Sequence, residues 1–212
     1  MSQPWKKWSF VPVMVLAAGT LALAQDPTPS PAPADPQPKS EVGKRAENQQ
    51  DRISQGVKSG QLTAGETANL ETKEAAINGE VKADRAANGG KLTAAEKTQV
   101  NRQQNKLSNQ IYQDKHNANT AHYGNNQVGQ RRENQQDRTA QGIKSGQLTA
   151  GETAKLENQQ RGINQQVKAD RAANGGKLTA GEKAQINKQQ NQASKNIYNK
   201  KHNAATQPGT KK

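Results

Sequence analysis

The chain has no cysteine and very few aromatic residues, and both absences limit how it can be stabilised. Without cysteine it gains nothing from an oxidising compartment, because no disulfide can form. Trp5, Trp8 and Phe10 lie near the N-terminus, and only three tyrosines follow. The mean hydropathy of −1.14 is strongly polar. A chain of 212 residues with so few large apolar groups cannot build one extensive core, so disorder has to be weighed against folding.

Catalytic and metal-binding patterns are also missing. The histidines are His116, His122 and His202, and they form no His-rich cluster that would indicate zinc. No Ser, His and Asp arrangement on recognisable turns supports nucleophilic catalysis. We therefore expect a protein that is not an enzyme, acts on no small-molecule substrate, and holds neither a metal nor a cofactor.

The first 24 residues are typical of a secretory signal peptide. Lys6 and Lys7 form a basic segment, and residues 10–23 are mostly apolar but short for a membrane span. Ala22-Leu23-Ala24 is a cleavage sequence, which predicts a mature chain that starts at Gln25 and does not span a membrane. The expected location is periplasmic or secreted; the alternative is a retained N-terminal anchor.

A long internal duplication dominates the rest of the sequence. The stretch "RAENQQDRISQGVKSGQLTAGET" from Arg45 returns as "RRENQQDRTAQGIKSGQLTAGET" from Arg131, an offset of 86 residues. Such self-similarity indicates repeated supersecondary units. The predicted organisation is a Pro-rich disordered tether (25–44), a first helical repeat (45–120), a linker (121–130), a second helical repeat (131–206) and a basic tail (207–212).

The spacing of the large apolar residues predicts an all-α protein. Leu70, Ile77 and Val81 follow an i, i+7, i+11 pattern, which falls on one narrow helix face. Asn78-Gly79 could interrupt this helix, but the other copy has Asn164-Gln165 there, so a continuous helix is expected. Each copy is predicted to form three helices, at about 45–58, 63–88 and 93–115 and then at 131–144, 149–174 and 179–201. The second copy has Thr139 for Ile53 and Ala193 for Leu107, and should fold more weakly alone.

Four Gly-x-Leu-Thr-x-x-Glu stretches lie between the predicted helices, and "SGQLTAGET" occurs twice. The Thr-x-x-Glu pattern matches a capping box, in which the Thr hydroxyl and the Glu carboxylate each accept a backbone N–H. The Leu before the cap can form half of a hydrophobic staple, and the Gly suits the end of the preceding helix. The predicted capping residues are Thr63, Glu66, Thr93, Glu96, Thr149, Glu152, Thr179 and Glu182.

Two ligand-binding alternatives apply to the same motif. It resembles the second half of an EF-hand loop, which leaves a degenerate, metal-free EF-hand-like module as one alternative. The early ligand positions fall on Gln55, Val57 and Ser59, which provide too few oxygen ligands for calcium. In "NGGKLT" the Gly, Lys and Thr before a helix could hold an anion, but Glu96 competes for the same amides.

The four Leu-Thr-x-x-Glu motifs, each at the start of a helix, resemble the LTxxQ motif of periplasmic helical proteins of the Spy and CpxP type. The resemblance covers five residues per motif, with Glu in place of Gln throughout. It implies helical hairpins and a chaperone-like or stress-protective role in the envelope. Family members include an ATP-independent chaperone with a basic concave surface, an inhibitor of stress signalling and zinc-linked proteins.

Each copy also ends in a Tyr-x-x-Lys-His-Asn pattern, at Tyr112–His116 and at Tyr198–His202. Tyr and His at this spacing share a helix face, so a weak metal or anion site is one interpretation. The other is a frayed helix end with a cation close to the C-terminal dipole. Acidic Asp51, Asp84 and Glu71 are surrounded by Lys and Arg at helical spacing and are interpreted as solvated ion pairs.

Positive charge is concentrated in the second copy. The formal net charge is +13; residues 45–120 carry 11 Lys and Arg against 9 Asp and Glu, whereas residues 131–206 carry 14 against 6. Glu74, Glu80 and Asp114 of the first copy are replaced by uncharged or basic residues. Candidate anion-binding residues are Arg131, Arg132, Arg138, Lys144, Lys155, Arg161, Lys168, Arg171, Lys188, Lys195, Lys200 and Lys201.

These features predict a non-enzymatic binding protein of the cell envelope, chaperone-like or stress-protective through a basic, Gln- and Asn-rich surface. Its partners would be unfolded or acidic proteins. One alternative is a binder of polyanions such as nucleic acid, lipopolysaccharide or cell-wall polymer. Another is a hydrophilin-like desiccation protectant that stays mostly disordered.

Overall fold

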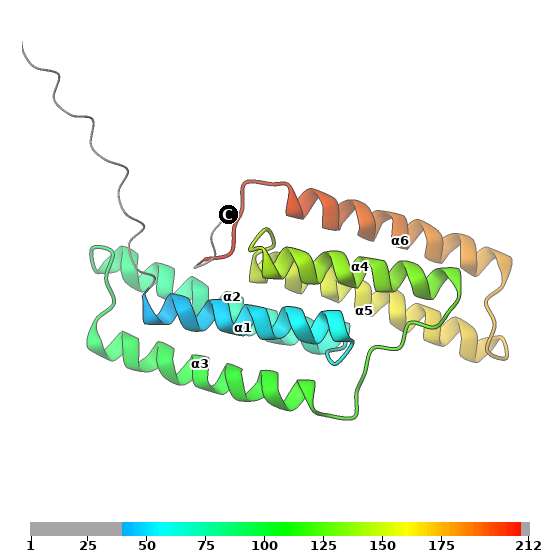
Figure 1. Ribbon diagram of the computed structural model, residues 1–212. Coiled ribbons are helices and arrows are strands. Elements are labelled where there is room, and N and C mark those ends of the chain that lie inside the picture. Colours follow the sequence, from blue (N-terminus) through cyan, green and yellow to red (C-terminus); the bar gives the residue numbers. More distant parts are fainter. Residues whose placement is uncertain (1–39, 209–212) are drawn as a thin grey trace, which may run out of the picture. The chain divides into compact units, whose positions relative to one another are not determined.

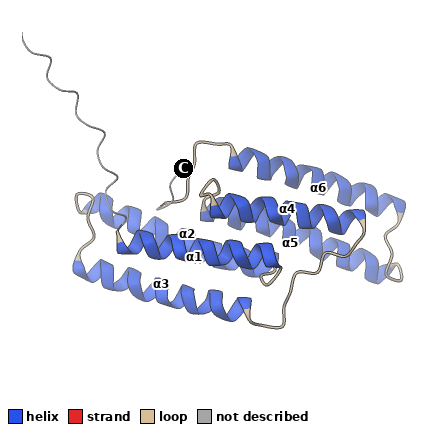
Figure 2. Cartoon of the chain, in the orientation of Figure 1, coloured by secondary structure: helices blue, strands red, loops and turns tan. Residues whose placement is uncertain are grey.

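The computed structural model describes residues 40–208, and within this range every regular element is an α-helix (Figures 1 and 2). The signal-peptide prediction and the basic end of the tail (209–212) lie outside the described residues. The all-α prediction is confirmed. The helices are α1 (Glu41–Ser59), α2 (Ala64–Ala87), α3 (Ala94–Lys115), α4 (Gln127–Lys144), α5 (Ala150–Ala173) and α6 (Ala180–Lys201).

The first helix of each repeat starts earlier than the sequence predicted. Helix α1 begins at Glu41 rather than near residue 45, and α4 begins at Gln127 rather than at residue 131. The side chains of Ser40 and Asn126 cap these helices by accepting the N–H of the residue three positions on. The end of the predicted tether (41–44) and the end of the predicted linker (127–130) are therefore helical.

All four predicted capping boxes are present, and each begins a helix. The Thr63 hydroxyl accepts the backbone N–H of Glu66 at 3.3 Å, while the Glu66 carboxylate accepts the N–H of Thr63 at 2.9 Å. The same reciprocal pair forms at the start of α3, α5 and α6. Helix α2 also runs without a break through Asn78 and Gly79, as predicted.

The leucine of the motif packs back onto the preceding helix. Leu62 is fully buried, and a Cβ at Gly56 of α1 would lie 2.6 Å from its side chain. The same close approach joins Leu148 to Gly142 of α4. Glycine is required at both helical positions because any side chain would collide with the leucine. The turn thus fixes the angle between the first and second helix of each repeat.

The two repeats pack against each other through equivalent surfaces. Helix α2 packs mainly against α5, and α1 packs against α4, so each of these four helices meets its own counterpart. The Ser54 hydroxyl donates to the carbonyl of Ala140 at 2.9 Å, and these positions are 86 residues apart. Contact between equivalent positions is what an approximate two-fold axis produces. The four inner helices form the interface, while α3 and α6 lie on the outside of their own repeats (Figure 1).

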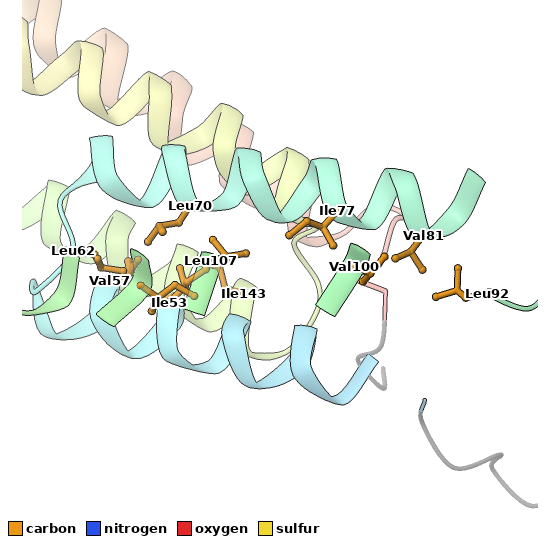
Figure 3. Close-up of a cluster of buried hydrophobic side chains, with 12 residues drawn as sticks. Ile53, Val57, Leu62, Leu70, Ile77, Val81, Leu92, Val100, Leu107 and Ile143 are labelled. Carbon is orange, nitrogen blue, oxygen red and sulfur yellow. The ribbon is translucent and has the colours of Figure 1, made fainter. Parts of the chain in front are cut away.

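The main apolar cluster spans the axis. The large apolar residues predicted for the first repeat are buried, and Ile143 of α4 joins them (Figure 3). Apolar residues of the second repeat divide into two smaller clusters, one of which contains Ala193 where the first repeat has Leu107. The weaker core predicted for the second copy therefore has a structural basis in its smaller side chains.

The interior between the repeats is unusually polar. Glu71, Glu74 and Glu157 are completely buried, although Glu71 was expected to lie in a solvated ion pair. That prediction is wrong because the α2–α5 contact covers this helix face. Asp51 and Asp84 are partly exposed, but neither forms an ion pair within residues 40–208. No described helix is long and apolar enough to cross a membrane.

Candidate anion-binding site

Four of the twelve candidate anion-binding residues line one cavity between the repeats. This inter-repeat cavity has a volume of about 670 Å³, and its basic residues are Arg132, Arg161, Lys168 and Arg171. The opposite wall is the start of α2 at residues 63–65, and the linker supplies residues 120–123. No Asp or Glu belongs to its lining. The cavity therefore places several positive charges on a small, partly enclosed surface.

Helix α5 provides three of these four charges on one face. Arg161, Lys168 and Arg171 follow i, i+7, i+10 spacing, which at 100° per residue keeps them on the same side of the helix. Helix α5 is held in place by its long contact with α2. The packing of the repeats consequently presents this face to the beginning of α2.

Arg161 reaches across to the N-terminal turn of α2. A Cβ added to Gly65 would lie 3.3 Å from Cδ of Arg161, so the arginine stem packs directly on this glycine. The pseudo-symmetric contact joins Gly151 to Ala75, where the neighbouring side chain is only a methyl group. Glycine in the first turn thus gives Arg161 room to lie against the helix end.

Arg132 is held on the ring of Tyr123. Its guanidinium carbon lies 5.4 Å from the ring centroid, within cation–π range. Burial lowers the pKa of Arg132, the neighbouring Tyr123 opposes this shift, and the charge of Arg171 adds to it. The Nε of Arg132 is buried without a hydrogen-bond partner. A buried donor of this kind is unsatisfied within the fold, and it can bind an acceptor in the cavity only if the side chain rotates toward it.

Tyr123 anchors the linker within the same region. It is partly buried, and burial raises the pKa of its hydroxyl, with the charge of Glu157 as the next cause. The linker backbone also passes very close to α4, since a Cβ at Gly129 would collide with the carbonyl oxygen of Tyr123. Tyr123 was not among the predicted site residues, because the linker has no counterpart repeat that would mark it.

The first turn of α2 leaves a backbone amide open toward this cavity. In the second repeat, the Ala150 N–H donates to Oε1 of Gln207 at 2.7 Å. The equivalent of Gln207 in the first repeat is Ala121, and no such bond forms at Ala64 among the described residues. Helix N-termini carry partial positive charge. The Glu66 carboxylate already caps this helix end, so the open amide contributes a hydrogen-bond donor rather than a free positive charge.

The pseudo-two-fold axis supplies an internal comparison. On the opposite edge of the α2–α5 interface, the residues equivalent to Arg132 and Arg161 are Ala46 and Ala75, and Gln207 closes the helix end. The same backbone thus carries two arginines and an open amide at one edge, and two alanines and a closed amide at the other. Comparison of the copies at Ala46 and Ala75 is the sequence signal that would have identified this site.

The remaining eight basic residues lie outside the cavity. Arg131 donates to Asn187 and Asn191, and Arg138 donates to the Ser194 carbonyl at 3.2 Å, so both hold α4 against α6. Lys200 forms an ion pair with Glu152 at 3.6 Å, and the stem of Lys201 packs over Gly142. The exposed members of the set are Lys144, Lys155, Lys188 and Lys195.

The other sequence motifs are engaged in structure. His116 and His202 stack on Tyr112 and Tyr198 with ring centroids 4.2 and 4.1 Å apart, and each contacts the tyrosine carbonyl at 2.7 Å. They lie at the C-caps of α3 and α6. Within residues 40–208 no group of three or more acidic or histidine residues could hold a metal ion.

A second electrostatic feature is the buried carboxyl cluster beside the axis. Oε2 of Glu71 accepts from Gln50 and Oε2 of Glu157 accepts from Gln136, both at 3.0 Å. Burial raises the pKa of Glu157 to about 8 and that of Glu71 well above its ordinary value. Glu157 is therefore largely protonated at neutral pH and does not offset the positive charge nearby, and burial shifts the pKa of Glu71 in the same direction.

Glu74 belongs to the same cluster but is held less tightly. Neither of its oxygens has a partner at hydrogen-bonding distance, although Asn78, one turn further along α2, partly opposes the shift. Burial raises the pKa of Glu74 to about 7. Gln160 takes its place in the second repeat and donates to Oε1 of Gln135 at 3.0 Å. An amide at this interior position is thus fully compatible with the fold.

Comparison with known proteins assigns no function. No family model matches the chain, and neither the curated proteins nor the solved structures contain a match.

Proposed function

We propose that this is an exported, non-enzymatic binding protein that holds negatively charged polymers of the cell envelope through its second repeat. The observation that carries the proposal is the concentration of accessible positive charge in the second repeat. Four of its basic residues line the inter-repeat cavity without a carboxylate, and Lys144, Lys155, Lys188 and Lys195 are exposed outside it. Export rests on the predicted signal peptide, which lies outside the described residues. Phosphate-bearing polymers are the partner class that such a surface attracts, and nucleic acid has the same charge chemistry and serves as a probe for it.

Local charge supports this partner class. Within residues 40–208, Lys200 is the only one of the twelve candidate residues that forms an ion pair. The other residues can neutralise phosphates of an anionic polymer. The counterions bound to these phosphates are then released, which makes the affinity depend strongly on salt. Stacking contributes little, because the exposed aromatic residues between positions 40 and 208 are Tyr112 and Tyr198, at the ends of α3 and α6. Binding is therefore expected to depend on charge rather than on base or sugar sequence.

The chaperone-like hypothesis stays a prediction with less support. Capture of unfolded proteins uses exposed apolar surface, and Tyr112 and Tyr198 are the only large apolar side chains exposed among the described residues. The protectant hypothesis relies on disorder, whereas both repeats have buried clusters and closed helix caps. A folded surface that acts by charge agrees best with these features.

Retention of the purified protein on heparin and on duplex DNA across a salt series tests the proposal. A quadruple variant (Lys144→Ala, Lys155→Ala, Lys188→Ala, Lys195→Ala) removes the exposed lysines of the second repeat. Its matched control removes four exposed charges from the first repeat (Lys58→Ala, Lys73→Ala, Lys82→Ala, Arg102→Ala). Both variants lose the same net charge.

The second-repeat variant should elute at clearly lower salt than the control. On duplex DNA, its log–log salt slope should fall by about 0.9 for each phosphate that the variant no longer neutralises. If both variants elute together, retention depends only on net charge and the second repeat is not the binding surface. If wild type is not retained at low salt, the proposed function is wrong.

A further inference from the structure

The inter-repeat cavity has properties that a diffuse basic surface lacks. Its volume of about 670 Å³ lies in the range of pockets that enclose small ligands. Its charges come from two helices and face the N-terminal turn of a third. Diffuse attraction of a polymer requires neither enclosure nor convergence of this kind.

We propose that the inter-repeat cavity is a discrete binding site for a single phosphate monoester group, held by Arg132, Arg161 and Arg171 and by the open amide of Ala64. The inference deepens the proposed function, because it names the chemical group of the ligand that this part of the surface recognises. The group can be pendant on an envelope polymer or belong to a free polyol phosphate.

Arginine is the residue type that suits this ligand. Its planar guanidinium presents a fork of N–H donors that matches two phosphate oxygens at once, and lysine offers only a point charge. Three arginines and one lysine line this cavity. A dianionic phosphate can satisfy several of these groups together, which a single carboxylate cannot do.

Two residues that line the cavity each carry a buried polar atom without a partner. These atoms are Nε of Arg132, a donor, and Oδ1 of Asn164, an acceptor. After rotation of the side chains, a phosphate oxygen can accept from the first, and a hydroxyl on the group that carries the phosphate can donate to the second. The cavity is also larger than a phosphate ion requires, so part of it remains for this carrier. An ester of a polyol or sugar fits both observations.

The open amide is created by one sequence difference. The N–H of residue 121 donates to the Gly60 carbonyl at 2.8 Å, and the N–H of Gln207 donates to the Gly146 carbonyl at 3.0 Å. Since the two backbones are held in the same way, a glutamine at position 121 would reach Ala64 as Gln207 reaches Ala150. The substitution Ala121→Gln would thus close the amide without changing the charge of the protein.

Calorimetric titration of the purified protein with glycerol 3-phosphate and with inorganic phosphate, at constant ionic strength, tests the site. Wild type should bind glycerol 3-phosphate saturably with one site, and more tightly than inorganic phosphate. The double variant Arg132→Ala with Arg161→Ala installs the residues that the first repeat carries at these positions. It should weaken binding at least tenfold, and Ala121→Gln should weaken it several-fold. Melting temperatures confirm that each variant is folded.

The control Lys58→Ala with Arg102→Ala removes the same charge from exposed positions of the first repeat and should leave the dissociation constant unchanged. Equal weakening in the control and the arginine variant would overturn the site. Absence of saturable binding by wild type would also overturn it, while salt-dependent heparin retention would still support the proposed function. Equal affinity for glycerol 3-phosphate and inorganic phosphate would overturn the ester assignment. A phosphate-bearing polymer that competes with glycerol 3-phosphate would identify the pendant group as the ligand.

Discussion

The buried carboxyl group of Glu157 makes the free energy of unfolding depend on pH, and glutamine substitution tests this directly. Its pKa is about 8 in the folded protein and near 4.5 when the chain is unfolded. The folded state therefore binds more protons than the unfolded state between these values. The free energy of unfolding that this carboxyl group contributes is fully present below about pH 4.5 and is lost as the pH rises through 8.

The size of this effect follows from the shift. Raising one carboxyl pKa from 4.5 to about 8 corresponds to on the order of 5 kcal/mol. Glu74, with a pKa of about 7, adds about 3 kcal/mol, which is lost between about pH 4.5 and pH 7. The capping glutamates act in the opposite direction, because the pKa values of Glu66 and Glu152 are lowered and their contribution is lost in acid. Stability should therefore be greatest near pH 5.

Urea unfolding at pH 5, 7 and 9 measures the effect. Glu157→Gln keeps the shape of the side chain and cannot ionise, and Gln160 shows that this interior accepts an amide. The variant should match wild type at pH 5 within about 1 kcal/mol and exceed it at pH 9 by on the order of 3–5 kcal/mol. The exposed Glu133→Gln variant is the control and should leave the pH profile unchanged.

The reasoning would be refuted if wild-type stability rose steadily from pH 5 to pH 9. It would also be refuted if Glu157→Gln left the profile unchanged, since the carboxyl would then not be the group that titrates. A large loss of stability in Glu157→Gln at pH 5 would mean that the acid proton makes a hydrogen bond that glutamine cannot replace.

Three further predictions concern two helical glycines and one helix cap. Gly142→Ala should destabilise the protein by about 1–3 kcal/mol because its Cβ would meet the Leu148 side chain at 2.6 Å. Gly162 lies on an exposed part of α5, where an added Cβ would have no atom within 4 Å, so Gly162→Ala should stabilise the protein by roughly 0.5–1 kcal/mol. Thermal unfolding of both variants tests the packing argument, which would be contradicted if the two melting temperatures shifted in the same direction. Thr149→Ala should cost about 1 kcal/mol through loss of the capping box, and an unchanged urea midpoint would show that the box does not stabilise α5.

Local patterns in the sequence were sufficient to locate most helix ends. A capping box needs only a Thr and a Glu three residues apart, and the left-handed conformation of Gly60 at the end of α1 is likewise a local property. Apolar spacing determined which face of each helix is buried, because it depends only on the pitch of the helix. The earlier starts of α1 and α4 were missed because Ser40 and Asn126 cap them with a glycine, and not a glutamate, three residues later.

The pairing of the repeats was decided only by the tertiary structure. Glu71 has basic and polar neighbours in sequence and looks like a surface residue, but the contact of α2 with α5 buries it. The same contact brings Arg161 onto Gly65, almost a hundred residues away, and forms the inter-repeat cavity. Sequence determined the helices and the excess of positive charge because both are properties of short segments. The cavity and the buried acids depend on which surfaces meet across the pseudo-two-fold axis, and that choice is set by packing between distant segments.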